Sequence, residues 1–231
     1  VDSEAEQLLR DADIAILSAK NRGTDQIQVF TPEMRTSIAE QAERDEALFR
    51  DVERYIIGER YLLDDQRKQS PFHVAFQPII RLSDDKIDGF EALFRWKWKN
   101  KPISPALFIK SAEETGRIVP IGHWVLEQSC QQMKTWLDRY GSRGPRSVNV
   151  NVSVRQLRVP GYVEGVAEVL KRFGLSPDNL CIEITESSFL ADEDMTRRVI
   201  AGLQQIGVRL SMDDFGTGYS SFSYLSRLPF S

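Results

Sequence analysis

Histidine and cysteine are scarce in this sequence of 231 residues, which contains two of each. A triad hydrolase needs a histidine paired with its nucleophile. The candidates are His73 and His123, and His123 fits the surface or the packing face of a predicted helix better than a catalytic role. Cys130 and Cys181 fall in a predicted helix and a predicted strand, where we expect small buried thiols of a reducing compartment rather than a disulfide framework.

Long apolar runs and blocks of basic residues are missing as well. The sequence contains no run of about 18 apolar residues, the length that a membrane-spanning helix needs. The net charge is −4, and lysine and arginine do not cluster as they do in nucleic-acid-binding segments. We therefore expect this segment to be cytoplasmic, with no membrane contact and no nucleic acid polymer as partner, although a longer parent protein could be membrane-anchored upstream.

The first part of the sequence predicts two helices and a short strand. Apolar residues recur at helical spacing over 4–19, and residues 26–30 alternate like a strand. A second helix begins at Thr31, carries an apolar stripe and ends near Gly58. That stripe fits an inter-domain signalling helix, but packing on a neighbouring element explains it equally well.

From Phe72 onward the sequence alternates between strand and helix patterns. The first two strand patterns are separated by a turn around Ser83, which predicts an antiparallel hairpin. The predicted strands cover 74–80, 87–96, 147–154, 180–186 and 208–213. The predicted helices cover 104–116, 120–140, 162–173 and 192–206.

The repeat length favours a barrel. Asn151, Glu183 and Asp213 end three successive strand patterns, at intervals of about 32 and about 30 residues, and a (β/α)8 barrel uses about 31 residues per strand–helix unit. A doubly wound open sheet has similar spacing, but it does not bring one ligand from each strand end around a common point. The predicted fold is therefore α/β, a TIM-like barrel. It is incomplete, since the sequence supplies about five of the eight strands.

Five acidic or amide side chains lie at the ends of these predicted strands. Carboxylates gathered in a fold interior repel one another and need a cation to stay ionised. Because every ligand offers oxygen, the set suits Mg²⁺ or Mn²⁺ better than Zn²⁺. Two adjacent aspartates at a strand end also have the geometry that bridges two ions and supports displacement at phosphorus. The predicted ligands are Glu91, Asn151, Glu183, Asp213 and Asp214.

Arg95 shares a strand face with Glu91, because residues an even number apart point the same way. The two side chains fit a structural ion pair, and they equally fit a metal ligand beside a phosphate-binding guanidinium. The glycine-rich stretch 216–221 lacks the Lys-Ser/Thr of a P-loop and is interpreted as a mobile lid. A glycosidase, which needs two carboxylates, and a purely structural cation site explain the set less well.

An ordered set of motifs over about residues 72–231 resembles the EAL domain of bacteria, a cyclic di-GMP phosphodiesterase module. The resemblance implies metal-dependent hydrolysis of one phosphodiester bond of cyclic di-GMP, which gives linear pGpG. The alternative is an inactive EAL module that binds cyclic di-GMP or a protein partner as a regulatory receptor. The motifs are Phe76-Gln-Pro-Ile, Glu91-Ala-Leu with Arg95-Trp96, Ser104-Pro, Ala112-Glu-Glu-Thr-Gly, Ile121-Gly with Trp124-Val-Leu, Asn151-Val-Ser, Glu183-Ile-Thr-Glu-Ser and Asp213-Asp-Phe-Gly-Thr-Gly-Tyr-Ser-Ser.

The resemblance also implies roles for individual residues. The five ligands named above would hold one or two ions of Mg²⁺ or Mn²⁺. Arg95 would contact a phosphate of the substrate, and Gln77 would lie near the bound dinucleotide. Glu186 would anchor the lid loop. The residues implied to be catalytic are Glu91, Asp213 and Asp214.

Residues 1–30 resemble the closing helix and strand of a GGDEF domain, a diguanylate cyclase-like module. The resemblance rests on Asp11-Ala-Asp-Ile-Ala15 with Ala19-Lys20, Gly23 and Phe30. It implies a parent protein with a GGDEF domain and a sensory domain upstream, a linker helix at 31–70 and an EAL domain from 71 to 231. A homodimer is a further expectation from the family.

The EAL pattern continues beyond the last residues of this sequence. In the family a strand bearing Lys and Asp follows, then a general-base Glu and a late Gln, and all of these would come after Ser231. A barrel without these elements exposes its sheet edges and half of its core. We therefore expect the isolated chain to be inactive, whatever the activity of its parent protein.

Overall fold

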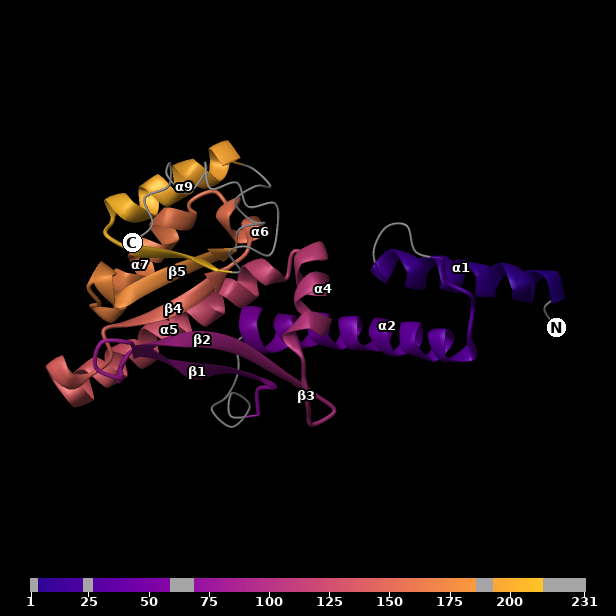
Figure 1. Ribbon diagram of the computed structural model, residues 1–231, viewed down its shortest axis with the longest axis horizontal. Helices are drawn as coiled ribbons and strands as arrows, with labels where there is room; N and C mark the ends of the chain where they lie inside the picture. Colours follow the sequence, from indigo (N-terminus) through magenta and orange to yellow (C-terminus); the bar gives the residue numbers. More distant parts are fainter. Residues whose placement is uncertain (1–3, 23–26, 59–68, 186–192, 214–231) are drawn as a thin grey trace. The chain divides into compact units, whose positions relative to one another are not determined.

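The computed structural model describes residues 4–22, 27–58, 69–185 and 193–213 (Figure 1). The chain divides into two compact units, Val1–Arg50 and Asp51–Ser231. No helix among the described residues combines the length and the apolar character needed to cross a membrane.

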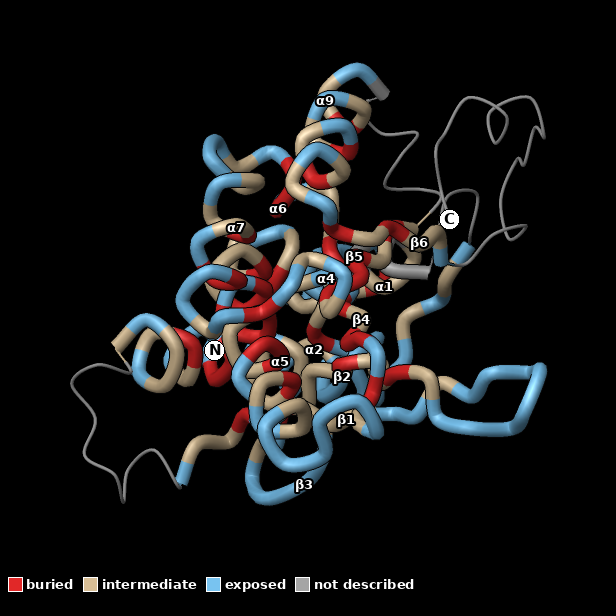
Figure 2. Tube along the Cα trace, turned by 90° about the vertical axis from the view of Figure 1, so that its left-hand side faces the viewer, coloured by how far each residue is buried: buried red, intermediate tan, exposed pale blue. Residues whose placement is uncertain are grey.

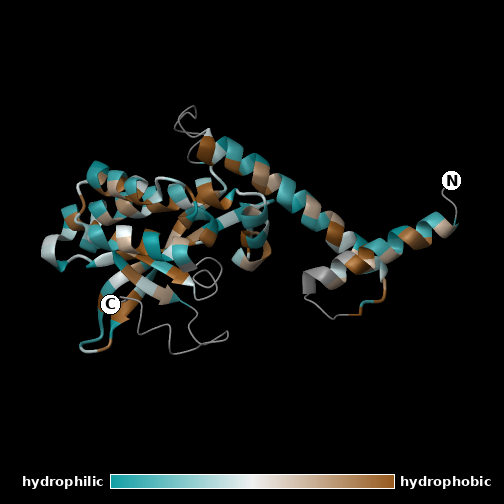
Figure 3. Cartoon of the chain, turned by 90° about the horizontal axis from the view of Figure 1, so that it is seen from above, coloured by the Kyte–Doolittle hydropathy of each residue, from teal (hydrophilic) through white to brown (hydrophobic). Residues whose placement is uncertain are grey.

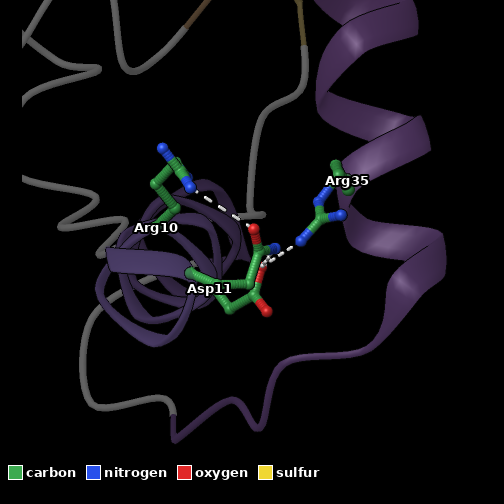
Figure 4. Close-up of polar contacts among 4 residues, drawn as sticks. Arg10, Asp11 and Arg35 are labelled. Atoms are coloured by element: carbon green, nitrogen blue, oxygen red, sulfur yellow. Dashed lines mark hydrogen bonds and ion pairs between the residues drawn. The ribbon is translucent and has the colours of Figure 1, made fainter. Parts of the chain in front are cut away.

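The first unit contains helix α1 (Glu4–Arg22) and most of helix α2 (Pro32–Val52). Arg35 of α2 forms an ion pair with Asp11 of α1 (Figure 4). The same guanidinium lies 5.5 Å from the centre of the Phe30 ring. Hydrophobic and hydrophilic residues are interspersed along both helices (Figure 3). After Val52 the helix continues as one turn of π-helix, η1 (Glu53–Ile57), with Gly58 at its C-terminal end.

The strand predicted over 26–30 is wrong for the part that the structure describes, because residues 27–31 form no regular secondary structure. A single strand leaves its backbone hydrogen-bonding groups unpaired unless another strand lies beside it. The described residues of this unit are otherwise helical, so they offer no such neighbour. Ile27 and Val29 are accordingly exposed. Residues 59–68 of the predicted linker lie outside the described residues.

The second unit is built on a mixed sheet of six strands in the order β1-β2-β4-β5-β6, with β3 paired to β2 (Figure 1). The first pair is an antiparallel hairpin, and β2, β4, β5 and β6 run parallel, which confirms the predicted arrangement. Over the described residues, β1 and β6 are the two edges, so the sheet is an incomplete barrel. The strands are β1 (Phe72–Arg81), β2 (Lys86–Trp98), β3 (Lys101–Ile103), β4 (Ser147–Val152), β5 (Leu180–Thr185) and β6 (Arg209–Asp213).

The helices lie between successive strands, and all of the predicted ones are present. α5 contacts β1, β2 and β4, while α9 contacts β6. The helix predicted over 104–116 is divided at Phe108 into a 3₁₀ turn and a short α-helix. The elements are η3 (Pro105–Leu107), α4 (Ile109–Glu114), α5 (Ile118–Tyr140), η4 (Gly141–Arg143), α6 (Val154–Leu157), α7 (Tyr162–Phe173), η5 (Pro177–Asn179) and α9 (Glu193–Gln205).

The buried residues of this unit are concentrated on α5 and on the central strands β4 and β5 (Figure 2). Every second residue of β5, namely Leu180, Ile182 and Ile184, is fully buried. On β2 the ring of Phe90 stacks on Trp136 of α5, with 4.5 Å between the ring centroids. Because strand side chains alternate between faces, burial of this apolar set leaves the intervening polar residues on the opposite face.

Strand β3 and helix α6 were not predicted. β3 follows a two-residue turn in which Lys99 and Asn100 both have positive φ, at 51° and 61°, as a type I′ hairpin turn requires. β4 ends at Val152 rather than at residue 154, because Ser153 begins helix α6. The backbone N–H of Ser153 donates to Oε1 of Gln156 at 3.1 Å. The Ser-x-x-Gln spacing is a capping-box signal that the strand prediction overlooked.

Candidate metal and phosphate site

Polar side chains gather on the face of the sheet opposite the buried apolar set. Glu91 of β2 lies level with Asn149 of β4, and Asn151 lies level with Glu183 of β5. Asp213, the last residue of β6, lies level with Thr185. These residues fall at alternate positions of their strands, so the pleat brings them to one surface.

Two hydrogen bonds join the amides and carboxylates of this surface diagonally. Asn151 donates its Nδ2–H to Oε1 of Glu91 at 2.7 Å, and Asn149 donates its Nδ2–H to Oε1 of Glu183 at 2.8 Å. Each asparagine therefore donates to the glutamate that is level with the other asparagine, and not to the glutamate directly beside it in the register. An asparagine that donates through nitrogen still offers its oxygen as a ligand.

Among the carboxylates of this surface, Glu183 has a shifted pKa. Burial raises the pKa of this carboxyl above its ordinary value, and the negative charges of Glu91 and Asp213 raise it further. The hydrogen bond from Asn149 acts in the opposite direction, since it favours the ionised form. A cation bound among these carboxylates would relieve both the desolvation and the mutual repulsion.

A groove of about 430 Å³ runs along this site. Its polar lining includes Arg95, Asn151 and Asp213, and isoleucines of α4 and α5 form part of an apolar wall. Arg95 is half-buried and donates from Nη1 to the carbonyl oxygen of Phe94 at 3.1 Å. A guanidinium beside carboxylates and an apolar wall suits a ligand that combines phosphate with an apolar ring.

The structure places four of the five predicted ligands, Glu91, Asn151, Glu183 and Asp213, on one surface. Glu91 departs from the expectation in one respect, because it lies in the middle of its strand and not at the end. The reason is that β2 continues to Trp98, where it pairs with β3.

The remaining predicted site residues have different outcomes. Gln77 is exposed on β1 and lies level with Glu91 on the neighbouring strand, beside the site. Asp214, Glu186 and the predicted lid at 216–221 lie outside the described residues. Asn149 was not among the predicted ligands, although its position two residues before Asn151 in a valine-rich strand was a visible signal.

The donor set fits a hard divalent cation. Over the described ranges, no three His, Cys, Asp or Glu side chains form a group that could hold a metal ion. The surface does combine two hydrogen-bonded asparagine–glutamate pairs with Asp213, so its donors are all oxygens. Such donors match Mg²⁺ or Mn²⁺.

Comparison with known proteins identifies the family. The model of the EAL domain matches residues 61–231. The bifunctional diguanylate cyclase/cyclic di-GMP phosphodiesterase MucR of Pseudomonas aeruginosa is 36% identical over 224 residues, which cover 96% of this chain and 30% of MucR. The chain therefore belongs to the EAL domain family, as its motifs predict. It spans less than a third of the length of MucR.

Solved structures agree with this assignment. The MucR phosphodiesterase in complex with c-di-GMP superposes with a TM-score of 0.69 at 36% identity, over 80% of this chain and 70% of that one. The EAL domain of Mycobacterium smegmatis DcpA gives a TM-score of 0.56 at 34% identity, over 69% and 63% of the two chains. Both likenesses support the incomplete barrel, while the GGDEF remnant at 1–30 stays a prediction.

Proposed function

We propose that this chain is part of a phosphodiesterase that hydrolyses cyclic di-GMP to linear pGpG. The observation that carries the proposal is the surface described above, in which Asn151 donates a hydrogen bond to Glu91 and also lines a groove with Arg95 and Asp213. The substrate is supported by the relatives, because MucR is a cyclic di-GMP phosphodiesterase by name and has been solved with c-di-GMP bound.

The proposed cofactor is one or two ions of Mg²⁺ or Mn²⁺. When bound, the metal supplies Lewis-acid stabilisation of the charge that develops on the phosphate. In this proposal Glu91, Asn151, Glu183 and Asp213 would hold the first ion, and Asp213 and Asp214 would reach the second. The proposed ligands are Glu91, Asn151, Glu183, Asp213 and Asp214.

Other side chains of the groove bind and orient the dinucleotide. Arg95 lines the groove, and its planar guanidinium can donate hydrogen bonds to phosphate oxygens of the substrate. Ile109 and Ile118 present an apolar wall on which a nucleobase can lie. Gln77 is assigned to the edge of the bound dinucleotide and Glu186 to the anchoring of the lid. Together these contacts exclude water from one side of the phosphate and fix its orientation.

Substitution of Glu91 in the full-length parent protein tests the proposal. Glu91→Gln should lower the turnover of cyclic di-GMP about 100-fold or more. Removal of a residue that only hydrogen-bonds to a metal ligand already lowers metal affinity or activity about 10–100-fold. Glu114→Gln makes the same chemical change at an exposed position of α4 and should leave turnover unchanged. Equal turnover in Glu91→Gln and the wild type, or full activity in excess EDTA, would contradict the metal mechanism.

The same measurements separate the enzyme from the receptor alternative. Isothermal titration with cyclic di-GMP reports binding, and chromatography of the products reports pGpG. Tight binding without pGpG in the wild-type parent protein would replace the enzyme by a regulatory receptor. Absence of both binding and turnover would remove cyclic di-GMP as the ligand.

For the first unit we propose the C-terminal end of a GGDEF domain, with a sensory domain further upstream and a homodimer as the assembly. Support comes from α1, where the apolar residues Leu8, Leu9 and Ile16 are exposed and so require a further packing surface. Hydrogen exchange on the full-length parent protein tests the domain assignment. Amides of α1 should be protected as strongly as those of α5, and rapid exchange along α1 would contradict it.

A further inference from the structure

Asn149 of β4 donates a side-chain hydrogen bond to Glu183 of β5. Its Nδ2 lies 2.8 Å from Oε1 of Glu183. In the register of the two strands, however, Asn149 lies level with Cys181, and Glu183 lies level with Asn151. The hydrogen bond therefore runs diagonally across neighbouring strands and turns the Glu183 carboxylate toward the level of Glu91 and Cys181.

The backbone on either side of this hydrogen bond is firmly held. β4 and β5 pair in parallel over residues 148–152 and 180–184. The side chains that flank Asn149 and Glu183 on the other face, Val148 and Ile182, are fully buried. Neither strand can turn or slip without exposing this core, so the two polar side chains have a fixed separation.

Glu183 needs such a partner more than an exposed glutamate does. It is half-buried, and its carboxylate has two other carboxylates, Glu91 and Asp213, within electrostatic range. Without a donor, an anion in this position turns toward water and away from its neighbours. With Asn149 bound at Oε1, the carboxylate keeps one orientation and offers Oε2 as a ligand.

We propose that Asn149 is a positioning residue that holds Glu183 ready to bind the divalent cation. This inference rests on the proposed function, since it takes Glu183 as a metal ligand. In this proposal Asn149 acts through Glu183 and is not itself a ligand of the metal. Its role thus differs from that of Asn151, which pairs with Glu91 and is a proposed ligand.

The test is the affinity for Mn²⁺, measured by isothermal titration on the full-length parent protein without substrate. Asn149→Val removes the donor and keeps a side chain suited to a strand. It should raise the Kd for Mn²⁺ about 10-fold, which is the smallest loss of affinity usually seen when a hydrogen-bond partner of a metal ligand is removed. At saturating Mn²⁺ the kcat should return to within about twofold of the wild type, and the KM for cyclic di-GMP should not change.

Two further variants complete the design. Asn149→Gln keeps an amide donor on a longer side chain and should recover part of the lost affinity. Asn179→Ala is the matched control, because Asn179 also donates one hydrogen bond from Nδ2, at 3.0 Å to the carbonyl oxygen of Arg146. Asn179 is the last residue of η5, four residues and about 13 Å of extended chain before Glu183. The Asn179→Ala variant should bind Mn²⁺ as the wild type does. If Asn149→Val does not fold, Asn149→Ser, whose side chain is too short to reach Glu183, takes its place.

The outcomes distinguish this inference from the function on which it rests. A wild-type protein that binds no Mn²⁺ and hydrolyses no cyclic di-GMP overturns the proposed function. A wild type that does both, with an Asn149→Val variant whose Kd stays within about twofold, overturns the role of Asn149 alone. A loss of thermal stability in Asn149→Val with no change in Kd has the same meaning, because it shows only a structural contribution.

Discussion

Asn151 and Glu91 are 60 residues apart in the sequence, yet Nδ2 of Asn151 lies 2.7 Å from Oε1 of Glu91. The contact exists because β2 and β4 are parallel neighbours, with α4 and α5 in the connection between them. A buried core on the other face fixes the position of both strands. The candidate site is therefore a property of the assembled sheet, and in the proposed function a bound cation offsets the repulsion between its carboxylates.

Glu183→Gln should stabilise the metal-free protein. The pKa of Glu183 is raised in the folded state, chiefly by burial, so the folded protein holds this proton more tightly than the unfolded chain does. The stability that the group contributes is present below the unfolded pKa and is lost as the pH rises through the folded pKa. Near neutral pH the ionised carboxylate thus weakens the metal-free fold, and the neutral amide removes that cost. Thermal unfolding in EDTA should show a higher Tm for Glu183→Gln.

The control for this substitution is Glu168→Gln, which makes the same change on the exposed surface of α7. Its Tm should equal that of the wild type. Addition of Mn²⁺ should raise the Tm of the wild type and leave that of Glu183→Gln unchanged, because binding to the folded state stabilises it. A lower Tm for Glu183→Gln in EDTA would show that the carboxylate supports the fold.

As the pH is lowered, the affinity for the metal should begin to decrease at a higher pH than it does at an ordinary glutamate site. Protons compete with the cation for the carboxylate of Glu183, and its raised pKa lets this competition begin at a higher pH. Titration with Mn²⁺ between about pH 5 and about pH 8 should show a Kd that rises steadily toward the acid end. A Kd that stays constant over this window would mean that Glu183 does not bind the ion.

Both cysteines should resist thiol reagents in the folded protein. Burial raises the pKa of Cys130 to about 12 and that of Cys181 to about 11. Because the thiolate is the reactive form, neither side chain should react with Ellman's reagent near neutral pH. Both should react after unfolding in guanidinium chloride. Rapid labelling of one thiol in the native protein would show that its strand or helix opens readily.

Gly122→Ala should destabilise the second unit by about 1–3 kcal/mol, the usual cost of overpacking a core. A Cβ at this position of α5 would lie 1.8 Å from Nε2 of Gln156, a buried side chain whose Oε1 accepts the N–H of Ser153. Denaturant unfolding measures the change. Gly165→Ala is the opposite control, because it lies inside α7 with nothing within 4 Å of an added Cβ, and it should stabilise the protein by about 0.5–1 kcal/mol. Equal effects of the two substitutions would contradict this account of Gly122.

Alternation within each strand was readable from the sequence. The valine and isoleucine positions of β4 and β5 predicted which side chains are buried, and thereby which polar residues share the other face. The repeat of strand and helix predicted the parallel order, and the motifs predicted the EAL family. These features are local, because the pleat of a strand and the period of a helix follow from neighbouring residues.

What the tertiary structure decided is how the strands meet. The sequence places Asn149, Asn151, Glu91 and Glu183 on one face, but it does not show that each asparagine bonds to the carboxylate one level away. The strand predicted over 26–30 failed for a related reason, because a strand needs a neighbour that local alternation does not supply. Sequence pattern fixes the face on which a side chain lies. Register between strands, set by packing of the whole core, determines which side chains touch.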